Sequence, residues 1–360
     1  MKKHFDLKPI LMAAAVLAGA CTGNESRTVN LENSLNSEPD TIGLESITEK
    51  IETVELQCDS LYDIRIFADY DGRLYGTTSD NRLVIFSQDG TLLHAYNRTG
   101  RGPGEYVWPD FNYDPFNHEI IVYDSQNKII RYDADGKFKD EIRNDVTSRL
   151  GSIMPIDTDT YVSTVMSFVQ RDSSLQYLDR NINVTGNALP IFNQAQLSSE
   201  GLILMEPTYL YNSVPMYQPY AEDTYYSWNG TSWQPYLRVD CGKYQMPAEL
   251  AIAVGKESEK AKYIFINRDY IAGNYYLVSY ARYEDLNLHY DVYEMTGGRR
   301  LMHNTQTEDE IMAGSDEGFI FRHEGETYRI MPQYVKDNVL YWSRFSEDGG
   351  TTLFKLTLKK

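Results

Sequence analysis

The chain has 360 residues, of which 42% are hydrophobic, and this length suits one large β domain or two ordinary domains. Its formal net charge of −18 argues against nucleic acid as a partner, because phosphate binding requires a concentrated basic face. The 29 tyrosines, against 13 phenylalanines and 4 tryptophans, favour strands with half-exposed faces over helices.

A secretory signal peptide is predicted at residues 1–20. Lys2, Lys3 and Lys8 precede an apolar run that ends in small residues directly before Cys21. The run is too short to span a bilayer as a stable helix, and its order is typical of a cleaved signal. The cysteine after the small residues resembles a lipobox, so we expect lipidation of Cys21 and an envelope location, at the outer membrane or the periplasmic face. A plain cleaved signal with an incidental cysteine is the alternative.

Residues 21–46 are predicted to be a flexible tether, because they are polar and show no sustained hydrophobic period. From residue 47 onward, short apolar or alternating runs are separated by turns of Asp, Asn and Gly, which is typical of strands. The two remaining cysteines, Cys58 and Cys241, fall in different strand groups, and we expect two buried free thiols rather than a disulfide.

Two consecutive strand groups have the same order. The first comprises residues 64–68, 73–78, 82–86 and 91–96, and the second comprises residues 111–114, 118–123, 128–132 and 137–142. Further copies of the turn motif, an aromatic or apolar residue followed by a polar turn with Gly or Asn, give six markers, at Gly90, Gly136, Asn181, Gly230, Gly298 and Gly350. The gaps between them are 46, 45, 49, 68 and 52 residues. This period predicts an all-β fold over 47–360, a six-bladed β-propeller of four-stranded antiparallel blades.

The gap of 68 residues contains a predicted short helical insertion near 247–255, with Pro247 at its start and Gly255 at its end. The charged residues 256–262 are expected to form a solvated loop. A ring of blades must also close, and we expect residues 51–56 and 351–358 to pair within one blade. Deleting residues 48–56 should then cost more stability than deleting residues 22–36.

Residues 97–109 read N-R-T-G-R-G-P-G-E-Y-V-W-P and form a constrained linker between the first two blades, in which Gly100, Gly102, Pro103 and Gly104 set the backbone. Residues 100–106 resemble the G-x-G-P-G-E-Y stretch of six-bladed β-propeller lipoproteins of Gram-negative bacteria, relatives of NHL-repeat propellers. Residues 238–247 resemble a second stretch of that family, with Cys241 in the place of Phe. The resemblance implies the fold and an envelope location, and it implies no agreed activity.

Candidate ligand-binding residues are Arg98, Arg101, Glu105, Tyr106 and Trp108, which are expected near one mouth of the central channel. Arg101 would bind a carboxylate or sulfate, Glu105 a hydroxyl or cation, and the two aromatic rings a sugar. In the structural alternative, Glu105 accepts backbone N–H groups of the glycine loop, and Tyr106 and Trp108 pack between blades.

The sequence favours a binding module over an enzyme. Its ligand would be a sugar, a peptide or another small molecule, or its partner an envelope protein, with membrane contact through the N-terminal lipid only. The alternative is an envelope hydrolase or lyase with a His/Arg/Tyr or carboxylate site at the channel mouth, with or without a metal ion. No catalytic residue can be assigned, because the histidines are scattered over different blades. No cofactor or metal site is expected, because the Asp-rich turns lack the later Glu of a calcium loop.

Overall fold

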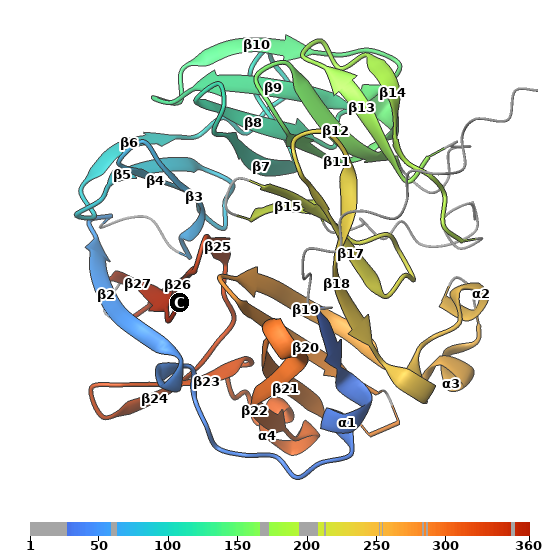
Figure 1. Ribbon diagram of the computed structural model, residues 1–360. Coiled ribbons are helices and arrows are strands. Elements are labelled where there is room, and N and C mark those ends of the chain that lie inside the picture. Colours follow the sequence, from blue (N-terminus) through green and yellow to red (C-terminus); the bar gives the residue numbers. More distant parts are fainter. Residues whose placement is uncertain are drawn as a thin grey trace, which may run out of the picture.

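The computed structural model describes residues 27–58, 63–165, 173–193, 208–211, 214–251, 253, 255–282, 284–285, 287–346 and 350–360. Six four-stranded antiparallel blades surround a central axis, which confirms the predicted six-bladed propeller (Figure 1). Most of the innermost strands contact the innermost strand of the next blade, and together these strands form the wall of a central channel.

The first three blades follow the chain. Blade 1 contains β3 (Arg65–Tyr70), β4 (Arg73–Thr77), β5 (Leu83–Ser87) and β6 (Leu92–Tyr96). Blade 2 contains β7 (Pro109–Asp114), β8 (Glu119–Asp124), β9 (Lys128–Asp133) and β10 (Phe138–Ile142). Blade 3 contains β11 (Leu150–Pro155), β12 (Thr160–Val165), β13 (Leu175–Asp179) and β14 (Val184–Leu189), with the short helix η2 (Thr147–Arg149) before it.

The last three blades carry the additions to the fold. Blade 4 contains β15 (Thr208–Tyr211), β16 (Val214–Tyr217), β17 (Thr224–Trp228) and β18 (Trp233–Asp240). Blade 5 contains β19 (Phe265–Ala272), β20 (Tyr275–Ala281), β21 (Leu288–Glu294) and β22 (Arg299–Gln306). Blade 6 contains β25 (Tyr334–Lys336), β26 (Val339–Phe345), β27 (Thr351–Leu358) and, outermost, β2 (Thr48–Leu56).

Tyrosines form much of the packing between blades. Tyr75, Tyr106, Tyr113 and Tyr132 are fully buried in one apolar cluster between blades 1 and 2. Their rings supply large apolar area, and the hydroxyls of Tyr106 and Tyr132 donate to backbone carbonyls. The abundance of tyrosine is therefore explained by strands that pack on both faces against neighbouring blades.

The ring closes as predicted, because β2 pairs antiparallel with β27 along its whole length, from Thr48 opposite Leu358 to Leu56 opposite Thr351. Five of the six turn markers lie between the third and fourth strands of a blade. The sixth, Gly350, lies between the second and third strands of blade 6, because the fourth strand of that blade comes from the N-terminal side of the chain.

The helical insertion is confirmed by α2 (Ala248–Ala251), which follows the short helix η4 (Gly242–Tyr244). The expectation of a loop at 256–262 is wrong in part, because the one-turn helix α3 (Glu257–Lys260) lies there, with exposed side chains. Three further elements come between the strands of blade 5 and those of blade 6. They are α4 (Glu308–Met312) and a hairpin of β23 (Phe319–His323) and β24 (Glu326–Ile330).

The prediction of a flexible tether is wrong for residues 27–46. β1 (Thr28–Asn30) adds a parallel fifth strand to β18, and α1 (Leu31–Leu35) and η1 (Leu44–Ser46) follow it. Val29, Leu31 and Leu44 are fully buried in the apolar clusters of blades 4, 5 and 6. The folded unit therefore begins no later than Arg27, and the polar composition of this segment reflects its exposed side only.

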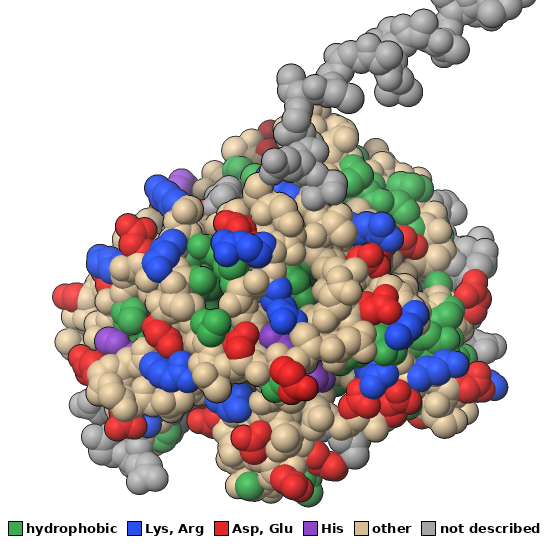
Figure 2. All heavy atoms as spheres, turned by 60° about the horizontal axis from the view of Figure 1, so that its bottom comes forward, with side chains coloured by type: hydrophobic (Ala, Val, Ile, Leu, Met, Phe, Trp, Pro, Cys, Tyr) green, Lys and Arg blue, Asp and Glu red, His purple; other side chains and the backbone are tan. Residues whose placement is uncertain are grey.

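The predicted signal peptide and Cys21 lie outside the described residues, whereas Cys58 and Cys241 are buried free thiols, as expected. None of the helices in the described ranges is long and apolar enough to cross a membrane. On the face seen in Figure 2, acidic and basic side chains are interspersed, and the hydrophobic side chains form small groups.

Candidate functional site: the central channel

A cavity of about 600 Å³ lies in the channel, lined mainly by residues near the starts of the innermost strands β3, β7 and β19 and just before β25. Ligand sites in proteins usually occupy about 300–1,000 Å³. A second cavity of about 310 Å³ is lined by residues further along the same strands, and the two cavities share Phe67, Asp110, Phe111 and Gln333. The channel is thus a two-chambered space with one set of residues at the junction.

One wall combines two aromatic rings with a carboxylate. Phe67 of β3 and Phe111 of β7 stack with ring centroids 5.5 Å apart. Asp110, beside Phe111, is accessible to water in the channel and has no hydrogen-bond partner in the part of the chain that the structure describes. Protein surrounds it on most sides, and this desolvation raises the pKa of the Asp110 carboxyl. Asp110 therefore presents free acceptors to anything that enters the channel.

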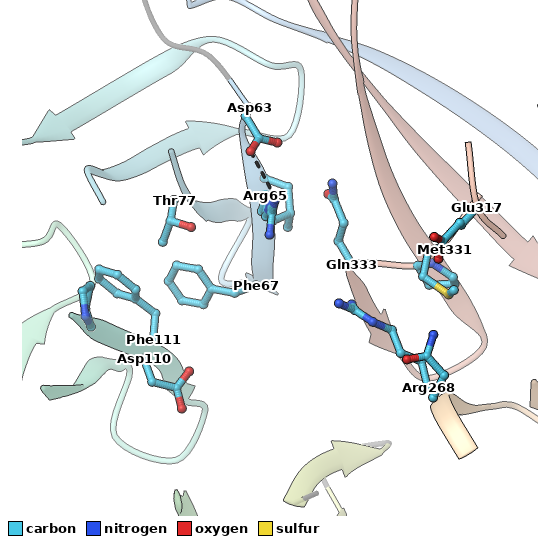
Figure 3. A pocket seen from close by; sticks show the side chains of 14 residues that line it. Asp63, Arg65, Phe67, Thr77, Asp110, Phe111, Arg268, Glu317, Met331 and Gln333 are labelled. Atoms are coloured by element: carbon cyan, nitrogen blue, oxygen red, sulfur yellow. Dashed lines mark hydrogen bonds and ion pairs between the residues drawn. The ribbon is translucent and has the colours of Figure 1, made fainter. Parts of the chain in front are cut away.

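The opposite wall presents donors. Arg268 of β19 extends its guanidinium into the space between the two walls, and Gln333 lies above it (Figure 3). The Gln333 side-chain oxygen accepts hydrogen bonds from the Ser343 backbone N–H (3.2 Å) and hydroxyl (2.6 Å), which leaves its NH₂ group facing the cavity. This wall therefore offers several N–H donors that form no ion pair with the Asp110 carboxylate across the cavity.

A buried hydroxyl belongs to the same wall. Burial raises the pKa of Tyr270 to about 12, and the nearby charge of Arg268 acts in the opposite direction. The Tyr270 hydroxyl is buried and makes no hydrogen bond with proper geometry to any described residue. A buried polar group without a partner costs about 1–3 kcal/mol, so its position at the channel requires an explanation.

Two further charges lie at the outer part of the larger cavity. Arg65 is paired with Asp63 at 3.2 Å, and both side chains are open to solvent. Glu317 is exposed on the opposite side (Figure 3). Because Arg65 already has a carboxylate partner, Arg268 is the cation of this cavity whose charge is left uncompensated.

The smaller cavity is aromatic. Tyr70 stacks on Tyr113 with ring centroids 5.0 Å apart, and the Lys336 ammonium lies 4.2 Å from the Tyr70 ring centroid. Tyr334 and Ile153 complete much of its wall. This chamber offers aromatic surface to an apolar group, beside the polar side chains of Asn112 and Asp269, whereas the larger one suits charged groups.

The candidate residues predicted from the sequence lie elsewhere, since none of the five lines either cavity. The Arg98 guanidinium donates to the Gly136 carbonyl oxygen at 2.8 Å and stacks on two tyrosine rings. Glu105 accepts the Gly102 N–H at 2.7 Å, as the structural interpretation states. Tyr106 is fully buried between blades, again as in that interpretation. Arg98 and Tyr106 thus hold the first two blades together, and Glu105 fixes the linker between them.

The remaining two candidates are exposed. Trp108 has 74% of its surface exposed, so the expectation that it packs between blades is wrong. Its backbone N–H and that of Val107 donate to Asp124, which fixes the main chain and leaves the ring outside. Arg101 is also exposed.

In the glycine loop at residues 100–104, neighbouring side chains lie very close to the backbone of two glycines. Gly104 has a φ of +68°, and a Cβ on it would lie 2.6 Å from the Phe138 ring. A Cβ on Gly100 would lie 2.1 Å from the Glu105 carboxylate. Gly104 therefore requires glycine, whereas a side chain at position 100 would displace the Glu105 carboxylate from its place in the loop.

An arrangement of Ser34, His303 and Asp291 superficially resembles a catalytic triad. However, the Ser34 hydroxyl (3.3 Å) and the Asp291 carboxylate (2.6 Å) both approach Nδ1 of His303, whereas a triad places them on opposite ring nitrogens. All three are buried, and Ser34 also accepts from Arg300 at 2.7 Å. The cluster fastens the N-terminal segment to blade 5. Within the described ranges, no group of three or more His, Cys, Asp or Glu side chains could hold a metal ion.

Sequence reasoning missed Asp110, Arg268 and Gln333. The sequence gives little signal for them, because the strands of Asp110 and Arg268 contain other polar residues, Asn112 and Asp114 in β7 and Asn267 and Asp269 in β19. Their proximity could not be read from the sequence, since they lie 158 residues apart and meet only when the ring closes.

The family model for a domain of unknown function, DUF4934, matches residues 26–344. The chain belongs to the DUF4934 family. The family match begins one residue before the described part of the chain, in agreement with a folded unit that includes the N-terminal segment.

Solved structures similar to this DUF4934 chain show the fold alone. A "putative exported protein" from Bacteroides fragilis is 13% identical, with a TM-score of 0.65, and the match covers 92% of this chain and 99% of that one. The C-terminal WD40 domain of Sif2 is also 13% identical, with a TM-score of 0.39 and 81% of each chain covered. No curated protein sequence matches the chain.

Proposed function

We propose that this protein is an envelope-tethered β-propeller that binds a small ligand, a sugar, a peptide or a segment of a protein partner, in the mouth of its central channel. The observation that carries the proposal is the pair of unpartnered charges, Asp110 and Arg268, on opposite walls of a cavity of about 600 Å³. Charged groups in a confined channel lose part of their hydration, and a ligand with complementary groups recovers that loss.

The envelope location rests on separate observations. The predicted signal peptide ends at Cys21, and the structurally similar Bacteroides fragilis protein carries the description of an exported protein. Lipid attachment is tested by labelling cells with radioactive palmitate. The full chain should incorporate the label and Cys21→Ser should not, whereas equal labelling of the two would contradict anchoring at this cysteine.

The binding function is tested by a thermal-shift screen of glycans, peptides and metal ions on the chain from residue 22 onward, which retains every described residue. The matched variant is Asn267→Trp, since Asn267 lines the cavity, is exposed to its water and makes no side-chain hydrogen bond within the described residues. A tryptophan there fills the mouth without removing a contact. Leu93→Trp, on the exposed face of β6, is the control.

Ligands of the channel should raise the midpoint of the unmodified chain and of Leu93→Trp, and should lose their effect in Asn267→Trp. Ligands that act equally on all three proteins would place binding outside the channel and overturn the proposal.

A further inference from the structure

We propose that the channel ligand is zwitterionic, an α-amino acid or a short peptide whose carboxylate is held by Arg268, whose ammonium group faces Asp110, and whose apolar side chain enters the aromatic chamber. This inference rests on the proposed function and names the ligand class of the same site.

The donor wall specifies an anionic group. The Arg268 guanidinium points into the cavity close to the Tyr270 hydroxyl, and no carboxylate among the described residues pairs with it (Figure 3). The Gln333 amide lines the same cavity but points away from Arg268. The orphan hydroxyl of Tyr270 lies near Arg268. A guanidinium binds a carboxylate through two parallel hydrogen bonds, and these charge-assisted bonds are about twice as strong as neutral ones. A neutral sugar would leave the charge of Arg268 uncompensated.

The facing wall specifies a cationic donor at a distance from that anion. Asp110 lies across the cavity from Arg268, and no ion pair joins them (Figure 3). The two charges are held apart by their own strands, β7 and β19, which belong to blades 2 and 5. A ligand that satisfies both must carry charges of both signs, separated across the cavity.

The chamber beyond specifies the side chain. Phe67 and Phe111 line both cavities, and the stacked pair of Tyr70 and Tyr113 lines the smaller one. A group that leaves the charged chamber along this wall meets aromatic surface, so an aromatic or branched aliphatic side chain is favoured over a polar one.

The test uses isothermal titration calorimetry on the chain from residue 22 onward, with phenylalanine, Gly-Phe and Gly-Gly-Phe as probes. Three modified ligands accompany them: Gly-Phe amide lacks the carboxylate, N-acetyl-Gly-Phe lacks the ammonium, and Gly-Ala lacks the large side chain. We expect each modification to weaken binding at least about tenfold, the effect of losing one charged hydrogen-bonded contact or of failing to bury a large side chain.

Two variants assign these losses to residues. Arg268→Gln should weaken Gly-Phe at least about tenfold and should no longer distinguish Gly-Phe from its amide, and Asp110→Asn should no longer distinguish Gly-Phe from its acetylated form. Arg299→Gln, which removes an exposed cation that is paired with Glu294 and lines neither cavity, should change affinity by less than about threefold. Thermal midpoints confirm that the variants fold.

The outcomes separate the two proposals. Equal affinity for Gly-Phe, its amide and its acetylated form, or unchanged affinity in Arg268→Gln, would overturn the zwitterion inference. If none of the zwitterions binds but a glycan does, and Asn267→Trp abolishes its binding, the inference fails and the channel function stands. If no ligand of any class is lost in Asn267→Trp, both fail.

Discussion

The N-terminal segment provides the sharpest test of the structure, through Leu31→Ala. Leu31 is fully buried among the cores of blades 4 and 5, although it belongs to a stretch whose composition resembles a linker. Truncation of a buried leucine to alanine costs about 2–5 kcal/mol, because apolar contact is lost and a cavity remains. The matched control is Ile42→Ala in the same segment, since Ile42 has 44% of its surface exposed.

The magnitude can be converted into a thermal midpoint. The entropy of unfolding is about 2.1 cal/mol/K per residue, so for a folded unit of this size 1 kcal/mol corresponds to about 1.5 °C. Leu31→Ala should therefore lower the midpoint by about 3–7 °C, and Ile42→Ala by about 1 °C or less. Both are measured by intrinsic tyrosine and tryptophan fluorescence on heating. Equal midpoints for the two variants would show that the segment does not pack against the blades.

Three further predictions concern buried groups and the glycine loop. Gly104→Ala should cost more stability than Gly72→Ala. Both glycines have positive φ, so an alanine at either position carries a conformational cost of about 1–2 kcal/mol, but only a Cβ at Gly104 meets an aromatic ring. Equal losses in the free energy of unfolding, measured in urea, would argue against close packing at Gly104. Glu141→Gln should lower the free energy of unfolding by about 3–5 kcal/mol, because the fully buried Lys128 ammonium loses the carboxylate 3.1 Å away. Glu52→Gln, in the exposed pair with Lys50, should lower it by less than about 1 kcal/mol. A similar loss for both variants in urea unfolding would contradict this assignment. Burial lowers the pKa of His289 from 6.5 to about 4, so the neutral form of its side chain stabilises the fold above pH 6.5. This contribution, about 3 kcal/mol, is lost as the pH falls from 6.5 to 4. His289→Asn should therefore flatten the dependence of the free energy of unfolding on pH in that window, measured in urea, and an unchanged slope would refute the assignment.

The blade count and the ring closure were accessible from the sequence because they depend on local turns and on a fixed period. Gly90, for example, has a φ of +87°, and a Cβ on it would lie 2.1 Å from the Glu55 carbonyl oxygen, so the turn and its packing both require the glycine that marked the repeat. The hairpin of β23 and β24 was missed because it fits within a gap of ordinary length between two markers.

The N-terminal segment and the channel were not accessible for a different reason. Val29, Leu31 and Leu44 are too few and too widely spaced to give a hydrophobic period, and the parallel pairing of β1 with β18 joins residues about 210 apart in the chain. The conspicuous residues Glu105 and Tyr106 proved to be structural, because a close-packed loop needs its acceptor and its buried ring as strictly as a site needs its ligands. A conspicuous motif in the sequence therefore did not reveal whether its residues serve loop packing or ligand binding.

The closure of blade 6 also determines when the protein can finish folding. β2 is among the first strands to be synthesised, and its partner β27 is the last one described, so the edge of β2 has no hydrogen-bonding partner until the final residues are available. Pairing across nearly the whole chain is slow to form, and an open strand edge invites association with other chains. Blade 6 therefore stays incomplete, with an open strand edge, until the whole chain has been synthesised.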